Sequence, residues 1–461
     1  MACSKNDSPP AKNIPPDIYH SPAVPEGGIT VLKNKIRQQP YIGAGYDIMG
    51  SYLDNTSVKQ QVIDLSKLDP DQIDNLAFRQ SCSKDYEGRD ATAFLKSIMT
   101  KNNFTLTGEN SNDLLFTGTL TEGEGKFSSP YDYSAQYTFI CEQSDNTALR
   151  RSIVLFSGKR LAPYVSDTFT EDVKTFTPQE IIKKYGTHVI RCAYLGNRIR
   201  NLYRTVVISS KDECLLAASY GAEARRQKIY KTAYDQSVPS AEVAKNYGGT
   251  TVVEFNGGDS EKLPDAVPDA PMDISAWMKS LLPSNYSLTT LSGNDLIPLY
   301  ELITDKATGD KLKEATVAYI RSGQLSVLKT HPLLQVCKGN RYRYFNSVDD
   351  LLENAAEDDR AVGIIGSLFD GYQPGASALY LYSNTETDYL SFDSGLADKL
   401  QMDLKGEIGY CYAMRGDNLD TLYEITDGAH YAYTLENKIQ YGEKGAWRKT
   451  GKEIYMKKVS L

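Results

Sequence analysis

Residues 177–196 predict a short helix that is capped at both ends and continues directly as a strand. Thr177 can accept hydrogen bonds from the free amides of the first helical turn, and Glu180 completes a capping box. Gly186 supplies the left-handed residue that ends the helix. From Val189 onward, β-branched and aromatic residues return, which is typical of a long strand. The residues between helix and strand therefore form a joint from which a long strand must begin.

Five residues at and after this joint form a pattern: Tyr185, Gly186, Thr187, His188 and Gly196. This pattern resembles the signature of the membrane attack complex/perforin (MACPF) superfamily. Two positions depart from it, because Val189 stands where an aromatic residue usually follows the His, and Asn197 stands where a second Gly usually follows the first. A tetrapeptide recurs by chance, so the identification depends on what surrounds it.

Further landmarks occur in the order that the family has them. Gly43 and Gly45 belong to an opening Gly-x-Gly-Tyr-Asp, while Trp277 and residues 297–302 are similar to the end of a MACPF domain. The opening has the wrong glycine spacing for a dinucleotide loop, and no apolar strand precedes it. The resemblance therefore covers residues 41–325.

The resemblance implies an α+β fold in which a bent, twisted antiparallel central sheet is flanked by two helical clusters. Beyond residue 330 it gives no guidance, and the sequence itself predicts short strands with two helices, a small α+β module. We therefore expect four segments, which are a lipoprotein anchor and Pro-rich tether at 1–40, a MACPF domain at 41–328, an α+β accessory domain at 329–415 and a small β-rich unit at 416–461.

Two segments occupy the positions of the helical clusters, which in the family unravel into membrane hairpins. Residues 67–128 have the first position and residues 209–247 have the second. Residues 66–112 are polar and helical in tendency, Asp90 can cap a helix there, and residues 114–120 suggest a strand. A strand that crosses a bilayer needs about 9–11 alternating residues. The second segment offers a candidate membrane-facing set on alternate residues: Cys214, Leu216, Ala218, Tyr220, Ala222 and Ala224. Arg226 ends this face, and Lys245 interrupts the opposing half of the hairpin. The alternative is a set of ordinary surface helices.

Paired glycines flank the apolar strand that we predict at residues 250–255. Such pairs relieve crowding and allow φ above zero, so a strand can bend there. Two pairs are candidates for the bend that the family has in its fourth core strand: Gly248 with Gly249, and Gly257 with Gly258. The second pair fits the family pattern slightly better, and either pair can equally be a turn.

The net charge of -8 is unevenly distributed along the chain. Residues 177–231 carry eleven basic against four acidic side chains, a balance of +7, and residues 341–430 carry six against seventeen, a balance of -11. One interpretation is a basic contact patch for anionic lipid or a neighbouring subunit, formed by Arg191, Arg198, Arg200, Arg204, Arg225 and Arg226. The other is two solvated faces of unlike charge. We do not expect nucleic acid as a partner.

The chain begins with a small residue before Cys3, followed by a polar, Pro-rich run. This arrangement is typical of the lipidated cysteine of bacterial lipoproteins, so we predict that a diacylated Cys3 anchors the protein. The tether at residues 7–40 would then hold the folded body away from the membrane. The alternative is an engineered start on a secreted or cytosolic protein.

Residues that could carry chemistry are few. The four histidines lie at 20, 188, 331 and 430, and no hydrolase, zinc-protease or phosphate-loop motif accompanies them. The seven cysteines lie far apart without the CxxC spacing of metal or redox sites. We therefore expect no catalytic residue, metal or cofactor, and we expect His188 to bond backbone or pack beside the joint.

These observations lead to two hypotheses. The first is a MACPF surface lipoprotein on the outer membrane of a Gram-negative bacterium, surface-exposed or released. The resemblance implies that it binds membrane lipid or a surface receptor or glycan on a target cell, assembles into rings or arcs, and inserts β-hairpins. The second keeps the fold without the pore, as a non-lytic adhesion or nutrient/protein-uptake component. Weak alternation in the hairpins favours the second hypothesis, whereas the glycine pairs and the basic stretch favour the first.

Overall fold

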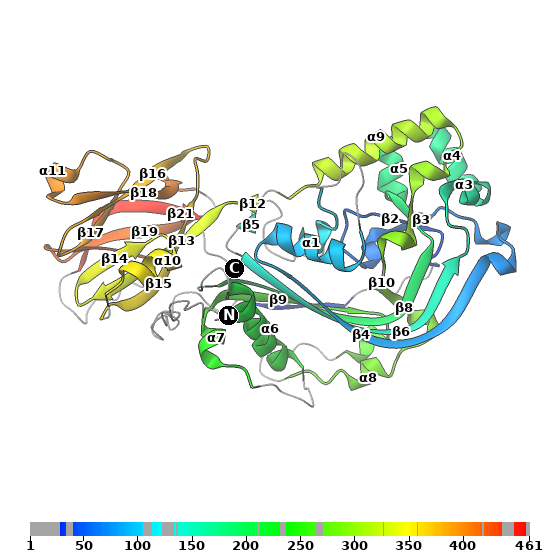
Figure 1. The fold of residues 1–461 in the computed structure, drawn as a ribbon, viewed down its shortest axis with the longest axis horizontal. Helices are drawn as coiled ribbons and strands as arrows, with labels where there is room; N and C mark the ends of the chain where they lie inside the picture. The colour runs from blue at the N-terminus through cyan, green and yellow to red at the C-terminus, as the bar shows by residue number, and fades with distance from the viewer. Residues whose placement is uncertain are drawn as a thin grey trace, which may run out of the picture.

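The computed structural model describes the following residues: 28–33, 40–104, 113–121, 133–134, 137–207, 209, 213–230, 237–263, 271–325, 327–356, 358–416, 419–435 and 447–457. They form a larger part with long curved strands and a smaller strand-rich part near the C-terminal end (Figure 1). A short parallel pair, β5 (Tyr133–Ser134) with β12 (Val327–Leu328), lies between them in this view.

The larger part is built on a six-stranded sheet in the order β1-β9-β8-β6-β4, with β10 also paired to β8. Its four long strands are β4 (Ile73–Gly88), β6 (Tyr137–Ile153), β8 (Cys192–Val207) and β9 (Asn246–Asn256), and neighbouring members are antiparallel. The short edge strand β1 (Ile29–Lys33) runs parallel to β9, and β10 (Ser287–Thr290) runs antiparallel to β8. The long strands curve together (Figure 1), so the predicted bent antiparallel sheet is confirmed.

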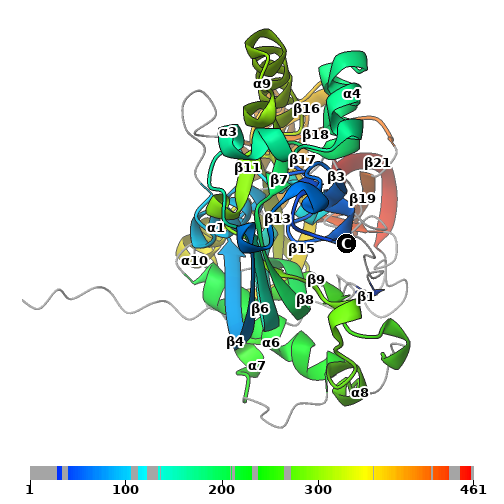
Figure 2. The same cartoon turned by 90° about the vertical axis from the view of Figure 1, so that its right-hand side faces the viewer.

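Helices pack on both faces of this sheet (Figures 1 and 2). On one face α1 (Ala91–Lys101) begins at its cap Asp90, as predicted, and its Phe94 stacks on Phe139 of β6. On the other face α6 (Cys214–Ile229) packs against Ile140, the next residue of β6. Because successive strand residues point to opposite faces, these contacts place the two helices on opposite sides. The short helices α7 (Ser240–Ala244) and α8 (Ser275–Met278) follow α6 in the chain.

A smaller sheet contains the predicted helix-to-strand joint. Its order is β11-β7-β2-β3, with bounds β2 (Ala44–Tyr46), β3 (Val58–Gln61), β7 (His188–Ile190) and β11 (Leu296–Pro298). Its helical neighbours in Figure 1 are α3 (Gly158–Leu161), α4 (Asp167–Thr175), α5 (Pro178–Tyr185) and α9 (Lys306–Ser322). The chain passes from α5 into β7 and then into β8, so the joint connects the small sheet to the central sheet.

The C-terminal part is one nine-stranded sheet. Its strands are β13 (Thr330–Lys338), β14 (Arg341–Phe345), β15 (Arg360–Phe369), β16 (Ala376–Ser383), β17 (Asp388–Ser391), β18 (Asp403–Tyr412), β19 (Leu419–Thr426), β20 (Tyr431–Leu435) and β21 (Arg448–Lys457), with helices α10 (Val348–Asn354) and α11 (Ala397–Leu400). β21 pairs with β19 and also with β15 and β18. The structure therefore has one sheet where the sequence led us to expect two units, because the last strands pair with strands of the preceding module.

Residues 66–112 differ most from our expectation of a helical segment. Residues 73–88 form β4, which pairs with β6 along most of its length and leaves many polar side chains exposed. This partner lies far along the chain, so local propensity could not reveal the pairing. Residues 114–120, which the sequence suggested as a strand, instead lead into the short helix α2 (Gly118–Thr121).

Candidate functional site

The joint between α5 and β7 has the geometry that its sequence predicts. The Thr177 side chain accepts a hydrogen bond from Glu180 N at 3.3 Å, and the Glu180 carboxylate accepts one from Thr177 N at 2.8 Å. Gly186 follows α5 with φ 77°, and a Cβ there would lie 2.5 Å from the carbonyl carbon of Tyr46. Glycine is needed both for this backbone conformation and for the close approach of β2.

The other signature residues tie the joint to its surroundings. The Tyr185 hydroxyl donates to Asp172 Oδ2 at 2.5 Å, and Lys184 Nζ lies 2.6 Å from the same oxygen. Hydrogen bonds from Lys184 and Tyr185 lower the pKa of Asp172. Thr187 N donates to Tyr46 O at 2.9 Å, which fastens the corner to β2. The signature is thus a packed, hydrogen-bonded joint.

His188 is partly buried in β7, and its Nδ1 lies 2.9 Å from Thr187 Oγ1. Burial lowers the pKa of His188 to about 4, so the ring is neutral at pH 7. A neutral imidazole that bonds to the neighbouring side chain suits the structural role that the sequence suggested.

We expect the protein to lose stability as the pH falls from 6.5 towards about 4. In this window the unfolded chain binds a proton at His188 that the folded chain excludes, so protonation favours unfolding. The loss attributable to this residue should be about 1–3 kcal/mol. Urea unfolding at pH 7 and at pH 4.5 measures it. His188→Gln cannot titrate and is the control, and an unchanged pH dependence in this variant would contradict the assignment.

Gly196 of the signature lies in close contact with one of the two candidate bend pairs, Gly257 with Gly258. A Cβ at Gly196 would lie 1.9 Å from Asn146 O on β6, and a Cβ at Gly257 would lie 2.3 Å from Gly196 O on β8. Gly257 and Gly258 both have positive φ, 76° and 68°, directly after β9. Three strands therefore approach one another here in a way that side chains would prevent.

The other glycine pair lies inside β9. Gly248 has φ 59°, and a Cβ at Gly249 would lie 2.3 Å from the Tyr203 hydroxyl. Nearby, the register of β8 against β9 shifts between Arg204 and Val206. Gly248 and Gly249 therefore mark an irregularity within β9, whereas Gly257 and Gly258 mark its end. A hinge role for either pair stays a prediction.

The basic contact patch that we predicted from the charge balance is wrong. Five of its six arginines are buried, and only Arg226 is partly exposed: Arg191, Arg198, Arg200, Arg204 and Arg225 are the buried ones. Those at 198, 200 and 204 occupy alternate positions of β8, so they all project from the same face of the sheet. That face is covered, and the side chains point into the protein instead of into solvent.

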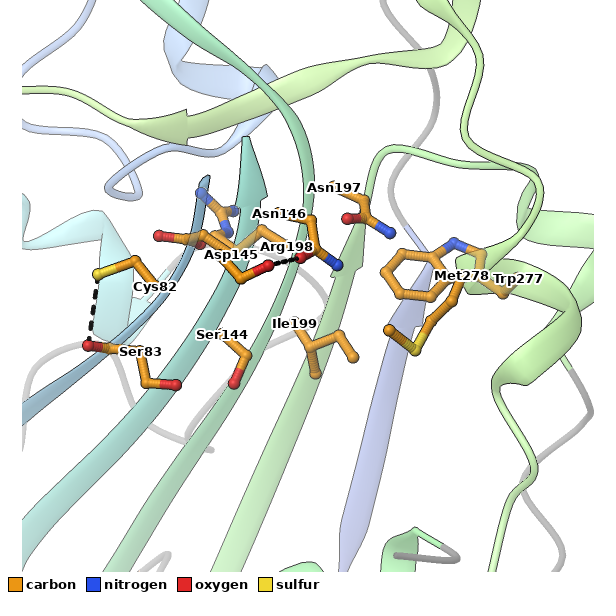
Figure 3. A pocket seen from close by; sticks show the side chains of 11 residues that line it. Cys82, Ser83, Ser144, Asp145, Asn146, Asn197, Arg198, Ile199, Trp277 and Met278 are labelled. Atoms are coloured by element: carbon orange, nitrogen blue, oxygen red, sulfur yellow. Dashed lines mark hydrogen bonds between the residues drawn. The ribbon is translucent and has the colours of Figure 1, made fainter. Parts of the chain in front are cut away.

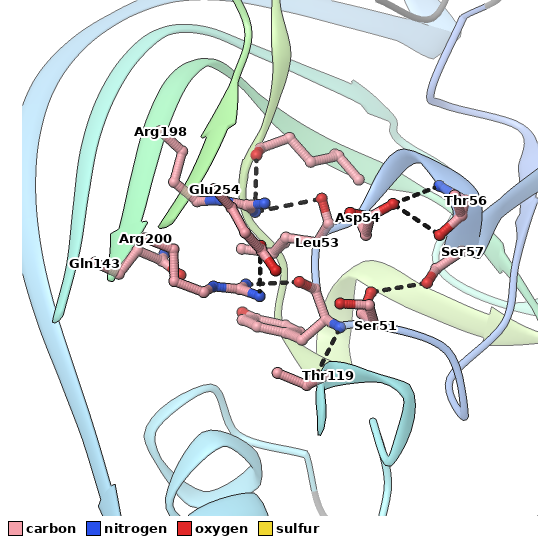
Figure 4. A network of polar contacts seen from close by, with 12 residues as sticks. Ser51, Leu53, Asp54, Thr56, Ser57, Thr119, Gln143, Arg198, Arg200 and Glu254 are labelled. Atoms are coloured by element: carbon pink, nitrogen blue, oxygen red, sulfur yellow. Dashed lines mark hydrogen bonds and ion pairs between the residues drawn. The ribbon is translucent and has the colours of Figure 1, made fainter. Parts of the chain in front are cut away.

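Two of these arginines fasten the sheet to the segment that follows β2 (Figure 4). Arg200 and Glu254 form an ion pair at 3.2 Å, with exposed side-chain fractions of 1% and 0%. Arg200 Nη2 also donates to Tyr52 O at 2.6 Å. Arg198 Nη1 is 3.3 Å from Leu53 O and from Leu288 O. The ion pair and these hydrogen bonds therefore join β8 and β9 to the segment around Tyr52 and Leu53 that packs over them.

The other four arginines also have partners within the chain, among them Arg204, whose guanidinium lies 4.4 Å from the centre of the Tyr137 ring. Arg225 Nη2 donates to Gly249 O at 2.7 Å, which joins α6 to β9. Arg226 forms an ion pair with Glu223 at 2.6 Å. Arg191 Nη2 donates to Asn294 O at 3.0 Å. The arginines of this stretch therefore make internal contacts, whereas Lys183 and Lys228 are exposed.

The candidate membrane-facing residues lie on α6, where alternate positions do not share a face. Ala218 and Ala222 are buried against Ile140 and Tyr203, whereas Leu216 is 55% exposed. Cys214, Tyr220 and Ala224 are partly buried. The segment is thus a helix in this state, at the position of the second cluster, and its contact with lipid stays a prediction.

Small side chains and polar contacts attach α6 to the sheet. Its buried residues are Ala217, Ala218, Gly221, Ala222, Arg225 and Ile229. Asn246 Nδ2 donates to Ala217 O at 2.8 Å, and Arg226 Nε lies 3.7 Å from Glu142 on β6. Burial raises the pKa of Glu142 to about 7, and the nearby Arg226 guanidinium of α6 partly offsets this rise.

The helix α1, in contrast, is attached to the sheet mainly by large apolar side chains. It buries Ala91, Phe94, Leu95, Ile98 and Met99 in the main core. Each large apolar side chain that is buried contributes about 1.5–3 kcal/mol. α1 thus buries four large apolar side chains, whereas α6 buries one, Ile229.

A cavity of about 260 Å³ opens on the sheet face that carries α6 and α8 (Figure 3). Its polar lining from β4, β6 and β8 includes Ser81, Ser83, Ser144, Asn146 and Asn197, and Trp277 and Met278 form its side. Trp277 Nε1 donates to Gly257 O at 2.9 Å. The cavity therefore lies beside the candidate bend.

Within the described ranges, no group of three or more His, Cys, Asp or Glu residues is placed to hold a metal ion. No helix in that part of the chain is long and apolar enough to cross a membrane. Cys3 lies outside the described residues, so its lipidation stays a prediction.

Comparisons with known proteins address the fold. No curated protein sequence matches the chain significantly. GNIP1Aa from Chromobacterium piscinae is similar in structure, with a TM-score of 0.50 and 14% identity over 90% of this chain and 81% of that one. A protein with a MAC/Perforin domain from Bacteroides thetaiotaomicron VPI-5482 has a TM-score of 0.48 and 14% identity over 70% of this chain and 69% of that one. The family model of the MAC/Perforin domain matches residues 35–329. This chain therefore belongs to the MAC/Perforin domain family.

Proposed function

We propose that this chain is a pore-forming or membrane-interacting surface lipoprotein that acts by target binding, oligomerisation and β-hairpin insertion. The observation that carries the proposal is how the long antiparallel strands are connected. β8 and β9 are neighbours in the sheet, and α6 lies in the segment that joins them. If this segment straightens, it lengthens both strands as one hairpin.

The sequence and attachment of α6 support this change. Residues 214–224 offer a largely apolar face when extended, and their length matches the about 9–11 residues that a bilayer-crossing strand needs. The helix is held by alanines, a glycine, polar contacts and one large buried apolar side chain, Ile229, so less apolar burial opposes its release than for α1. In this proposal Cys214, Leu216 and Tyr220 contact lipid after insertion.

The other parts of the chain take the remaining roles in this proposal. Cys3 anchors the protein at the bacterial outer membrane, and the C-terminal sheet binds lipid, a receptor or a glycan on the target cell. The protein acts by assembly, without catalysis or a cofactor. The acidic composition of residues 341–430 favours a target surface that presents basic or neutral groups.

A disulfide that locks α6 to the sheet tests the hairpin step. The Cys214 thiol hydrogen-bonds to the Thr138 side chain of β6, so Thr138→Cys brings two thiols together. With Cys3 and Cys82 changed to Ser, the oxidised variant should release no dye from liposomes, whether these are anionic or zwitterionic. Reductant should restore release.

The matched control combines Thr138→Cys with Cys214→Ser, which keeps the new cysteine but forms no lock. It should behave the same with and without reductant. Dye release by the oxidised lock at the rate of the reduced form would contradict insertion by this segment.

The alternative function is non-lytic adhesion or uptake on the cell surface. Lys245 favours it, because this residue would interrupt the lipid face of the hairpin, and here it pairs with Glu242 at 2.8 Å. Binding to target cells with neither dye release nor rings in electron micrographs, across several lipid compositions, would support this alternative.

A further inference from the structure

The cavity on the face of the central sheet that carries α6 and α8 has a floor of two neighbouring rows of side chains (Figure 3). In the first row Ser81 of β4 pairs with Asn146 of β6, which pairs with Asn197 of β8. The next row on the same face consists of Ser83, Ser144 and Ile199. Because neighbouring strands lie about 4.8 Å apart, the floor is a closely spaced set of hydroxyl and amide groups.

The helix α8 forms a wall at one side of this floor. Trp277 and Met278 of α8 line the cavity. Trp277 Nε1 donates to Gly257 O at 2.9 Å, and the indole also packs on Phe255, with ring centres 5.2 Å apart. These contacts fix the position of the indole, so the cavity combines a polar floor with an apolar wall.

Asn197 is the most deeply buried polar side chain of the floor. It is 2% exposed, and its amide makes no hydrogen bond with any residue that the structure describes. Figure 3 shows this amide directed towards Trp277. Buried polar groups are nearly always hydrogen-bonded, so we expect a molecule in the cavity to supply the partner. Asn197 is also a position where the chain departs from the MACPF signature, and the usual glycine would place no amide here.

The described residues that line the cavity project no charge into it. Asp145 and Arg198 border the cavity, but they alternate with Asn146 and Asn197 along their strands and so project from the opposite face. On that face the Asp145 carboxylate accepts a hydrogen bond from the Gln143 amide at 3.0 Å. A phosphate, a carboxylate or an amine in the cavity would therefore meet no opposite charge.

The chemistry of the floor and the wall suits an uncharged sugar. Serine hydroxyls and asparagine amides both donate and accept hydrogen bonds, as sugar hydroxyls require. Ser81 Oγ already donates to Asn146 Oδ1 at 2.5 Å, which engages the oxygen of that amide and keeps its nitrogen for a ligand. The volume of about 260 Å³ is smaller than the about 300–1,000 Å³ of pockets for drug-sized ligands, so it suits one sugar unit.

We propose that this cavity binds one uncharged sugar unit. The hydroxyls of the sugar bond to Asn197, Asn146 and Ser144, and its C–H face packs on Trp277 and Met278. The bound sugar contacts both the sheet and α8, so it holds α8 in place beside Gly257 and Gly258. This site goes beyond the proposed function, because it does not depend on pore formation or on the C-terminal sheet.

Trp277 provides a fluorescent probe inside the cavity. The chain has two tryptophans, and Trp447→Phe keeps an aromatic ring beside Tyr342 while leaving Trp277 as the only indole. Titration of this variant with glucose, mannose and N-acetylglucosamine should give a saturable change in emission with at least one of them. Glycerol, which has hydroxyls but no ring, should give none. No saturable change with any of the three sugars, or an equal change with glycerol, would overturn the proposal.

Two substitutions in the Trp447→Phe background test the contacts. Asn197→Ala and Ser144→Ala should each weaken sugar binding about tenfold, the effect of one lost hydrogen bond. Ser144 is exposed, so its replacement keeps the test valid if Asn197→Ala fails to fold. Asn75→Ala, also exposed but on β4 outside the cavity, is the matched control and should bind like the parent. Unchanged affinity in both cavity variants would overturn the assignment.

Oligosaccharides distinguish the two sources of such a sugar. Maltotriose, mannotriose and chitotriose contain the same units as the three monosaccharides. A trisaccharide that binds at least tenfold more tightly than its monosaccharide would support the site and assign it to a glycan chain. Equal affinities would support the site and assign it to a free sugar.

Discussion

Replacing Arg200 by Met is expected to lower the free energy of unfolding by about 3–5 kcal/mol. The substitution removes the guanidinium that pairs with the fully buried Glu254 carboxylate at 3.2 Å. It also removes the donor to Tyr52 O, so a second buried acceptor loses its bond. Chemical denaturation at pH 7, followed by circular dichroism, measures the change.

The double variant Arg200→Met with Glu254→Met should recover most of the lost stability, because an apolar pair of similar volume replaces an ion pair whose desolvation is costly. A surface pair provides the matched control. Lys306 and Asp310 lie 2.9 Å apart but are solvent-exposed, so Lys306→Met should leave the midpoint unchanged. An Arg200→Met variant as stable as the Lys306→Met control would show that the buried pair does not hold the sheet.

The parts of the fold that could be predicted from the sequence are those fixed by local chemistry. The caps of α5 depend on Thr177, Glu180 and Gly186, which lie within one short segment, and the structure has each of them. The Asp90 cap of α1 is another such case. Local caps need no knowledge of distant partners.

Elements that depend on distant partners were not predictable in the same way. β4 is polar and largely exposed, and it is a strand because β6 lies beside it. The last strands, β19 to β21, join the preceding module because β21 pairs with β15 and β18. In both cases the pairing partner, rather than the strand's own composition, decides the structure.

The candidate site shows the same limit for side chains. A charge count along residues 177–231 suggested a basic surface, yet Arg198, Arg200 and Arg204 are buried. Their spacing along β8 contained the missing signal, since residues at even separations share one face of a strand. That face is buried because the segment around Tyr52 and Leu53 packs over it. Nothing in the sequence indicated that this segment lies against β8.

Gly186→Ala should lower the free energy of unfolding by about 3–6 kcal/mol, because backbone strain and a steric clash act together. Gly186 has φ 77° and ψ −152°, and a Cβ would lie 2.5 Å from the Tyr46 carbonyl. Gly339→Ala isolates the strain, since its φ is 61° and nothing lies within 4 Å of a Cβ there. That control should lose only about 1–2 kcal/mol. Thermal unfolding compares them. Equal losses in the two variants would mean that β2 moves aside to make room for the new methyl group. A larger loss at Gly186 would show that the close contact with Tyr46 holds the small sheet in place against the helix-to-strand joint.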